Sequence, residues 1–325
     1  MTTSDNTRPR ILIVVSTGFP QEQFDKFSAK WPQAEFVDAT DDTVYEKVRG
    51  ANALIGCPRR EFTKELLARA RESLQWVHGP GAGVEEFLIP DFVDSDITFT
   101  NGKVIQGPEV ADHAIALLLA LARNLHLVLT GNGDSPLPRP IELRDKNALV
   151  IGLGGVGMLV AERASAFGMR VSGVTAGTLP PMLSMLERVY PPESLDEALP
   201  DADAVIVSAP HTELTSQVFG RRQFGLMKES AYFVNVSRGR LVNTDELFKA
   251  LQEGAIGAAG LDVTDPEPLP DEHPLRQLPN VIITPHIAGL SDHNRRRSID
   301  LTKTNIGRFL KGMPLLNVVD KKLGY

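Results

Sequence analysis

Short runs of β-branched and other apolar residues alternate with longer helical stretches along the whole chain. This alternation is typical of a parallel sheet covered by helices. In the first hundred residues the pattern predicts strands at 11–15, 53–55 and 75–78, and helices at 24–31 and 63–70. These elements predict a small α/β unit that ends near residue 100.

A second unit begins with a predicted helix at residues 110–124, in which apolar residues occupy nearly every face. We expect such a helix to be buried all round, at a domain or subunit interface. Glycines and prolines within residues 130–140 then predict an extended arm. The pattern after the arm predicts strands at 148–151, 170–174, 204–208, 232–235, 258–262 and 281–284, and helices at 156–167 and 244–253. Together these elements predict a doubly wound sheet.

The last predicted helix, at about residues 292–311, follows the last predicted strand, so no further strand of the second sheet remains for it to connect. We therefore expect it to cross back to the first unit. The predicted fold class is α/β, with two doubly wound parallel-sheet (Rossmann-like) domains. One domain comprises residues 1–101 plus 291–325, and the other, residues 102–290, is inserted into it.

Composition narrows the classes of protein to which the chain can belong. Its 325 residues are 42% hydrophobic and 23% charged, which is enough for two cores and excludes wholesale disorder. The net charge of -7, without a long basic run, argues against a nucleic-acid-binding protein. The most apolar stretch, residues 114–122, is about half as long as a membrane span. The N-terminus lacks the apolar region of a secretory signal.

The cysteine and histidine content points to a reducing compartment and gives no sign of a metal site. The single cysteine, Cys57, cannot form an internal disulfide. The seven histidines show no metal-ligand spacing. We therefore expect a cytoplasmic protein with no metal and with neither nucleic acid nor membrane as a partner.

A glycine-rich turn is the first candidate for chemistry. Residues 152–157 read G-x-G-x-x-G directly after an apolar strand and at the start of a helix. Gly152 permits the tight turn, Gly154 lets backbone N–H groups approach a pyrophosphate, and Gly157 allows close packing of helix on strand. A purely structural turn is the alternative. The surrounding strands and helix favour dinucleotide binding, with Gly155 and Val156 at the start of the helix.

The residue after the next strand bears on the choice of cofactor. In an NAD-binding domain an acidic residue about 20 positions past the glycines commonly binds the ribose hydroxyls. Here that position holds Thr175, which cannot repel a 2′-phosphate. Because no arginine stands there to select the phosphate, both NAD and NADP remain open, and the threonine favours NADP.

Three further predicted strands are followed by an arginine, a glutamate and a histidine. Arg238 follows the strand at 232–235, Glu267 stands five residues beyond Asp262 at the end of the next strand, and His286 follows the strand at 281–284. The carboxyl ends of parallel strands share one edge of a sheet, where doubly wound folds bind their ligands. We therefore expect Arg238, Glu267 and His286 at one site.

These three residue types suit hydride chemistry on a 2-keto acid. A guanidinium can hold a carboxylate bidentately and polarise the adjacent carbonyl group. A histidine can give the carbonyl oxygen its proton as the hydride arrives, and a neighbouring carboxylate stabilises the imidazolium. Taken singly, each residue has an ordinary structural interpretation: a surface arginine, a loop carboxylate and a buried histidine.

Several stretches in a fixed order carry a resemblance to a known family. They are residues 110–123, with Asp-His-Ala at 112–114, the glycine turn at 152–157, Asn-Val-Ser-Arg-Gly-Arg at 235–240, Leu-Asp-Val at 261–263, Glu-Pro-Leu-Pro at 267–270 and Thr-Pro-His-Ile-Ala-Gly at 284–289. Over almost its whole length the chain resembles the D-isomer-specific 2-hydroxyacid dehydrogenases, and among them the glyoxylate and hydroxypyruvate reductases. This likeness implies that residues 102–290 form the dinucleotide-binding domain and that the other domain binds substrate.

The resemblance also implies roles for individual residues. Arg238 would bind the keto-acid group, His286 would be the acid/base, and Glu267 would orient and charge His286. Asp262 would hold the nicotinamide carboxamide. The remaining cofactor positions implied by the resemblance are Pro210, Val236 and Ser237.

In the first domain the resemblance implies that the substrate carboxylate meets backbone N–H groups of Ala82 and Gly83. These residues lie in a glycine-rich turn at 79–84, and such a turn can form an anion-binding nest without a charged side chain. A plain connecting turn is the alternative interpretation.

The activity implied by the resemblance is NAD(P)-dependent reduction of a small 2-keto acid, such as glyoxylate or hydroxypyruvate, to a D-2-hydroxy acid. Two alternatives remain open. One is a nucleotide-sensing protein like the corepressors that share the fold, which would bind without useful turnover. The other is a family dehydrogenase acting on another donor, such as formate or phosphite. The apolar helix and the proline-rich arm predict a homodimer.

Overall fold

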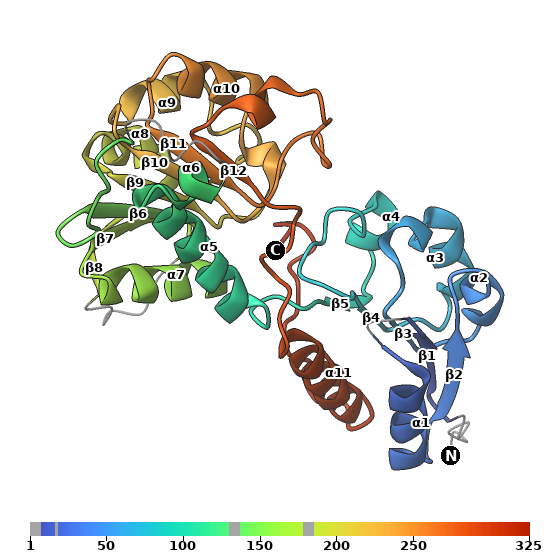
Figure 1. Ribbon diagram of the computed structural model, residues 1–325. Helices are drawn as coiled ribbons and strands as arrows, with labels where there is room; N and C mark the ends of the chain where they lie inside the picture. The colour runs from blue at the N-terminus through green and yellow to red at the C-terminus, as the bar shows by residue number, and fades with distance from the viewer. Residues whose placement is uncertain (1–7, 17–18, 130–136, 178–184) are drawn as a thin grey trace. The chain divides into compact units, whose positions relative to one another are not determined.

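The computed structural model describes residues 8–16, 19–129, 137–177 and 185–325. The chain divides into two compact units (Figure 1). Unit 1 comprises Met1–Ile105 and Ser291–Tyr325, and unit 2 comprises Gln106–Leu290. Among the helices of the described residues, none is long and apolar enough to cross a membrane.

Unit 1 is built on a five-stranded parallel sheet in the order β2-β1-β3-β4-β5. Its strands are β1 (Arg10–Val14), β2 (Glu35–Ala39), β3 (Ala53–Ile55), β4 (Trp76–His78) and β5 (Thr98–Thr100). Its helices are α1 (Gln21–Lys30), α2 (Val44–Lys47), the 3-10 helix η1 (Arg59–Glu61), α3 (Lys64–Ala70), α4 (Pro90–Val93) and α11 (Asn294–Phe309).

Successive side chains of a strand point to opposite faces of the sheet, and in unit 1 this alternation gives an apolar cluster on each face. Along β1, Ile11 and Ile13 enter the cluster that also receives α1 and α11, whereas Leu12 and Val14 enter the opposite one. Ile306 of α11 is fully buried in the first of these clusters. The last helix therefore completes the core of unit 1, as the sequence predicted.

The C-terminal segment after α11 is also part of unit 1. Val318 forms an antiparallel bridge with Thr100 at the end of β5. Further along, the ammonium group of Lys321 donates to the backbone oxygens of Phe92, at 2.8 Å, and Ser95, at 2.6 Å. The end of the chain is thus hydrogen-bonded to the segment that leads into β5.

Unit 2 contains a seven-stranded parallel sheet in the order β12-β11-β10-β9-β6-β7-β8. Its strands are β6 (Asn147–Ile151), β7 (Arg170–Val174), β8 (Leu186–Tyr190), β9 (Ala204–Val207), β10 (Tyr232–Asn235), β11 (Ala258–Leu261) and β12 (Val281–Ile283). The chain starts at β6, runs outward to β8, and then returns to β9 on the other side of β6. The sheet is therefore doubly wound, with its switch point between β6 and β9.

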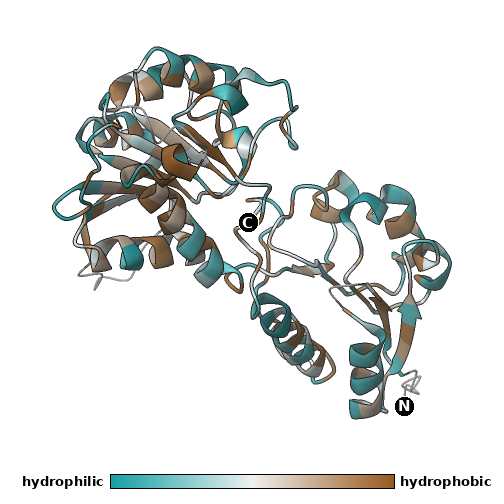
Figure 2. Cartoon of the chain, viewed as in Figure 1, coloured by the Kyte–Doolittle hydropathy of each residue, from teal (hydrophilic) through white to brown (hydrophobic). Residues whose placement is uncertain are grey.

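Helices cover both faces of this sheet (Figure 1). They are α5 (Gly107–Ala122), α6 (Leu125–Leu129), α7 (Gly155–Ala166), α8 (Leu195–Ala198), α9 (Arg221–Leu226) and α10 (Thr244–Gln252), with the 3-10 helices η2 (Pro192–Ser194), η3 (Leu199–Asp201), η4 (Gly239–Leu241) and η5 (Pro274–Gln277). Figure 2 shows hydrophobic colours in the strands of unit 2 and hydrophilic colours mostly on helices and loops around them.

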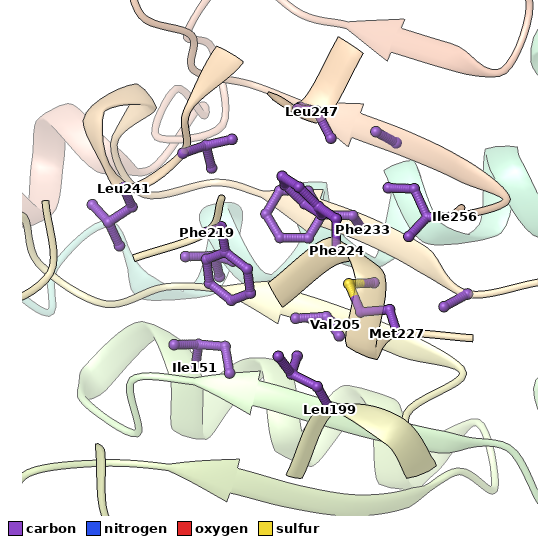
Figure 3. Packing of buried hydrophobic residues seen from close by; sticks show 14 of the residues in the cluster. Ile151, Leu199, Val205, Phe219, Phe224, Met227, Phe233, Leu241, Leu247 and Ile256 are labelled. Atoms are coloured by element: carbon purple, nitrogen blue, oxygen red, sulfur yellow. The ribbon is translucent and has the colours of Figure 1, made fainter. Parts of the chain in front are cut away.

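One face of the unit 2 sheet packs around aromatic side chains (Figure 3). The ring of Phe233 on β10 meets the rings of Phe219 and Phe224 edge to face, at centroid distances of 5.0 and 5.4 Å. Such aromatic contacts add to the free energy of burial. The packing anchors β10, the strand that leads to Arg238.

The chain by itself does not bury the helix near residues 110–124 on every face, and the predicted subunit interface at this helix stays a prediction. Helix α5 packs on α7 and on the sheet through β10 and β11, but Asp112 and Ala116 are exposed. These two positions lie four residues apart, so they share one face of the helix. Asp112 on that face accepts a hydrogen bond from Arg163 of α7 at 2.6 Å, so it lies at the edge of the contact between the two helices.

The arm predicted at residues 130–140 lies partly outside the described residues, which omit 130–136. Residues 137–143 contain no helix or strand, as an extended segment requires. Ile141 is tied to the end of α5 because its amide donates to the carbonyl oxygen of Ala122 at 2.8 Å.

Candidate functional site

The three strands β10, β11 and β12 lie side by side at one end of the unit 2 sheet. Arg238 follows β10, Glu267 follows β11 and His286 follows β12. Because the strands are parallel, their carboxyl ends share one edge. The structure therefore places all three predicted residues after the ends of neighbouring strands.

Glu267 and His286 form a direct pair. Nδ1 of His286 lies 2.5 Å from Oε1 of Glu267, and both side chains are about half exposed. An ionised carboxylate accepts hydrogen bonds and cannot donate them, so Nδ1 carries the shared proton. The other ring nitrogen of His286, Nε2, is then the atom that can exchange a proton with a ligand.

The Arg238 side chain is held at its own strand end. Its Nη1 atom donates to the carbonyl oxygen of Ser237 at 2.8 Å. Its carbonyl oxygen accepts from the side-chain amide of Asn235 at 2.9 Å, and the same Asn235 accepts from the Ser237 hydroxyl. These bonds fix the backbone from which the guanidinium extends.

His286 has an unusual backbone conformation, with φ of 53°. This left-handed region is costly for a residue with a side chain, and it persists only where the surroundings hold it. The amide of His286 donates to the carbonyl oxygen of Asp262 at 3.0 Å. Residues in sparsely populated conformations cluster at functional sites, and here the conformation sets the direction of the candidate acid.

Asp262 holds the loop that carries His286. The residue is 2% exposed, and its carboxylate accepts hydrogen bonds from the Thr284 hydroxyl at 2.6 Å, the Ile287 amide at 2.9 Å and the Ala288 amide at 2.9 Å. A carboxylate has about four acceptor positions. Most of the capacity of Asp262 is therefore used within the protein, and its predicted contact with the nicotinamide stays a prediction.

A side chain from α5 extends this network. Nε2 of His113 lies 2.9 Å from the Thr284 hydroxyl oxygen and 3.5 Å from Oδ1 of Asp262. The single hydroxyl proton of Thr284 is directed at Asp262, so Nε2 of His113 must be the donor in its contact with Thr284. Neither His113 nor Thr284 has a role in the sequence-based prediction. A motif search does not reveal a bond between residues 171 positions apart in the chain.

The glycine turn joins β6 to α7. Gly152 has φ of 90°, and a Cβ there would stand 2.6 Å from the Cα of Ala209. A Cβ at Gly157 would overlap the carbonyl oxygen of Gly152. Around a Cβ at Gly154, by contrast, the described residues other than its chain neighbours place no atom within 4 Å. Gly152 and Gly157 are therefore required for folding, and Gly154 leaves open space for a ligand.

The start of α7 offers hydrogen-bond donors beside this open space. Among the described residues, the amides of Gly154, Gly155 and Val156 donate to no backbone or side-chain acceptor. The N-terminus of a helix carries a partial positive charge and favours anions such as a pyrophosphate. The turn thus fits the phosphates of a dinucleotide.

The remaining predicted cofactor positions lie at strand ends of the same sheet. Thr175 follows β7, and its hydroxyl accepts from the Gly177 amide at 3.3 Å. Pro210 is exposed after β9, and Val236 and Ser237 are buried after β10. The nearby Arg188 pairs with a glutamate at 2.8 Å, so its charge is already compensated.

The predicted carboxylate-binding turn lies in unit 1, between β4 and α4. Its peptide groups are fixed by neighbours: the Gly81 carbonyl accepts from the Gly102 amide at 2.8 Å, and the Ala82 carbonyl accepts from the Asn101 side chain at 2.7 Å. In the described part of the chain, the amides of Gly81, Ala82 and Gly83 have no acceptor. Three consecutive amides are therefore available to an anion.

A buried histidine directly precedes this turn. His78 ends β4, and its Nδ1 lies 2.8 Å from the hydroxyl oxygen of Thr100, which also accepts from the Trp76 indole at 2.8 Å. Burial lowers the pKa of His78 from 6.5 to about 4. His78 is therefore neutral near pH 7.

No group of three or more histidine, cysteine, aspartate or glutamate side chains in the described residues could hold a metal ion.

Comparison with known proteins identifies the family. The model of the "D-isomer specific 2-hydroxyacid dehydrogenase, NAD binding domain" matches residues 115–288. A glyoxylate reductase of Aeropyrum pernix is 31% identical over 326 residues, covering 97% of this chain and 94% of the relative. A family protein of Aeromonas salmonicida has a similar structure, with a TM-score of 0.80, 29% identity, and coverage of 97% of this chain and 100% of that chain.

A third relative was solved with a nucleotide. The D-isomer specific 2-hydroxyacid dehydrogenase of Xanthobacter autotrophicus, in complex with NADPH and MES, gives a TM-score of 0.81 at 26% identity over 97% of this chain and 99% of that chain. The comparisons confirm the predicted family and fold class. The chain is an oxidoreductase, and it belongs to the D-isomer-specific 2-hydroxyacid dehydrogenase family.

Proposed function

We propose that the protein is an NAD(P)H-dependent reductase of small 2-keto acids, such as glyoxylate or hydroxypyruvate, and that His286 is its acid/base. The observation that carries the proposal is the 2.5 Å pair between His286 and Glu267, one strand away from the end of β10 where Arg238 stands. A carboxylate-supported imidazole and a guanidinium are the groups that protonation and polarisation of a ketone require.

The bound nicotinamide supplies the hydride that reduces the keto carbon. The Arg238 guanidinium binds the keto-acid group and draws electron density toward the carbonyl oxygen. Nε2 of His286 gives that oxygen its proton, and the negative charge of Glu267 stabilises the imidazolium before the transfer. The amides of Gly81, Ala82 and Gly83 bind the substrate carboxylate. The product is the 2-hydroxy acid, and the reverse reaction uses His286 as a base.

The domain roles follow from the same proposal. Residues 102–290 form the dinucleotide-binding domain, with the pyrophosphate at Gly154, Gly155 and Val156. Residues 1–101 and 291–325 form the substrate-binding domain. Asp262, Pro210, Val236 and Ser237 serve the nicotinamide and adenosine parts of the cofactor.

NADPH is the proposed physiological reductant. Thr175 offers no negative charge to repel a 2′-phosphate, and its hydroxyl is compatible with a hydrogen bond to one. A family structure at 26% identity was solved with NADPH. The kcat/KM values for NADPH and NADH, measured with the same keto acid, decide the point. A preference for NADH would overturn the proposed cofactor.

The protein acts as a homodimer in this proposal. Beside the arm, α6 exposes Val128 and Leu129 with 53% and 83% of their surface accessible, which is unusual for large apolar side chains on one short helix. A partner subunit would cover them. Sedimentation of the purified protein as a monomer at micromolar concentration would contradict this part of the proposal.

The proposed location is the cytoplasm. Cys57 is the single cysteine, and burial raises the pKa of its thiol to about 12. A chain without a disulfide fits a reducing compartment. Fractionation of the native host with an antibody tests this assignment.

The central test is oxidation of NADPH or NADH by glyoxylate, hydroxypyruvate and pyruvate, followed by absorbance. We expect turnover with at least one of these acids. Formate and phosphite, each with NADP⁺ or NAD⁺, form the second arm of the assay. Turnover of a donor in that arm without keto-acid reduction would replace the proposed substrate class. Nucleotide binding without any turnover would favour a sensing protein.

A further inference from the structure

Arg59 lies beside the carboxylate-binding turn of unit 1. It is the first residue of η1, four positions after the end of β3. Its Nη2 atom lies 3.7 Å from the position that a Cβ on Gly81 would occupy. Among the described residues, apart from the two chain neighbours of Gly81, no other atom lies within 4 Å of that position. The open side of Gly81 thus faces a guanidinium group.

Within the part of the chain that the structure describes, the charge of Arg59 has no protein partner. Among the described residues its side chain makes no hydrogen bond and no ion pair, although it is half-buried. The next residue, Arg60, is exposed and lies 3.0 Å from Asp41 and 3.4 Å from Glu61. A partly desolvated cation without a counterion is costly. The position of Arg59 suits an anion that binds from outside.

The turn itself already serves one anionic group under the proposed function. Amides of Gly81, Ala82 and Gly83 are available for the carboxylate next to the keto group, and Arg238 is assigned to the same end of the substrate. A second guanidinium would leave excess positive charge around one carboxylate. Arg59 is therefore better matched to a second acidic group.

We propose that Arg59 is a specificity-determining residue that binds a second acidic group of the substrate. The preferred substrates are then 2-keto acids that carry a carboxylate or a phosphate away from the keto-acid end. A guanidinium recognises both groups through paired N–H donors. This inference rests on the proposed function and names the substrate class of the same site.

The test compares matched substrates that differ in that acidic group. 2-Oxoglutarate is compared with 2-oxovalerate for a carboxylate, and 3-phosphohydroxypyruvate with hydroxypyruvate for a phosphate. For the unaltered protein we expect kcat/KM to be about tenfold or more higher for the acidic member of at least one pair, since a charged hydrogen bond is involved. The pair that responds identifies the acidic group.

Substitution then assigns the preference to Arg59. Arg59→Gln should lower the acidic-to-neutral ratio of kcat/KM by about tenfold or more, and Arg59→Lys should keep part of it because the charge remains. Arg60→Gln is the matched control, and its ratio should equal that of the unaltered protein. Melting temperatures of the three variants show whether each is folded.

Several outcomes would overturn the inference. One is equal kcat/KM for the acidic and neutral members of both pairs in the unaltered protein. Another is a loss by the same factor for both members in Arg59→Gln, which would assign Arg59 to the carboxylate that all substrates share. Turnover of glyoxylate keeps the proposed function in either case. Absence of turnover with every keto acid would remove the proposed function and this inference together.

Discussion

Replacing Asp262 with asparagine should destabilise unit 2 even without a bound cofactor. The carboxylate accepts three hydrogen bonds, from the Thr284 hydroxyl and the Ile287 amide on Oδ1 and from the Ala288 amide on Oδ2. Asparagine keeps one oxygen and places an NH₂ group where the other oxygen stood. Because NH₂ donates and cannot accept, at least one backbone amide of the loop loses its acceptor.

The size of the effect follows from these contacts. Loss of one hydrogen bond to a charged group costs about 1.5–3 kcal/mol, and a buried amide left facing another donor costs about 1–3 kcal/mol more. The expected loss is therefore roughly 2.5–6 kcal/mol, which for a domain of this size lowers the melting temperature by about 5–24 °C. The kcat should fall as well, because Asp262 holds the loop that carries His286.

Thermal unfolding of the cofactor-free protein measures this loss separately from any role of Asp262 in nucleotide binding. Asp271→Asn is the matched control: Asp271 is exposed, so the same chemical change there should leave the melting temperature unaltered. A melting temperature of Asp262→Asn within about 2 °C of the control, below the range worked out above, would refute the view that Asp262 holds this loop.

Five further substitutions test other parts of the structure. His286→Gln should lower kcat by about two orders of magnitude with nucleotide affinity retained, as expected for a positioned acid, and steady-state activity within a few-fold of the original would contradict the assignment. Glu267→Gln should also lower kcat, because His286 then loses the negative charge that stabilises its imidazolium. Because burial lowers the pKa of His78 from 6.5 to about 4, the unfolded chain binds more protons between these values. The unfolding free energy should therefore rise as pH rises through this window, by up to about 1.4 kcal/mol per pH unit, and be lost again as pH falls. Urea titrations at several pH values should show a shallower slope for His78→Gln, and an equal slope would count against this reasoning. Gly157→Ala should prevent close packing of α7 on β6 and cost roughly 3 kcal/mol or more, visible as a lower melting temperature, whereas Gly154→Ala should melt near the original.

The central strands of both units could be predicted from their apolar runs, but the edge strands β2, β5 and β8 could not. β2 and β8 carry charged and exposed positions, such as Asp38 and Arg188, because an edge strand is covered less and is protected from pairing by charge. Their weak pattern hides them from a search for buried runs. The face of α5 that the chain itself leaves exposed could not be recognised either, since alanines at exposed positions look the same as alanines in a core.

The candidate catalytic residues could be found because topology places the ends of neighbouring parallel strands at one edge. The supporting residues depend on packing between distant segments. His113 reaches Thr284 because α5 packs on the sheet near β12, and Arg59 reaches Gly81 because the loops after β3 and β4 lie next to each other. Neither of these two contacts between distant residues produces a periodicity or a motif in the sequence.

The insertion of one unit into the other affects the order in which the protein folds during synthesis. Unit 2 is a continuous stretch, and its two ends lie together, since the side chain of Gln106 donates to the carbonyl oxygen of Gly289 at 3.2 Å. Unit 1 is incomplete until the end of the chain is made, because its core includes Ile306 and Lys321 donates hydrogen bonds to the segment before β5. The ribosome releases the chain from its N-terminus. Synthesis of unit 2 therefore begins after that of unit 1, but unit 2 is the first unit whose fold can be completed. The opening hundred residues must wait, with an incomplete core, for the final thirty-five.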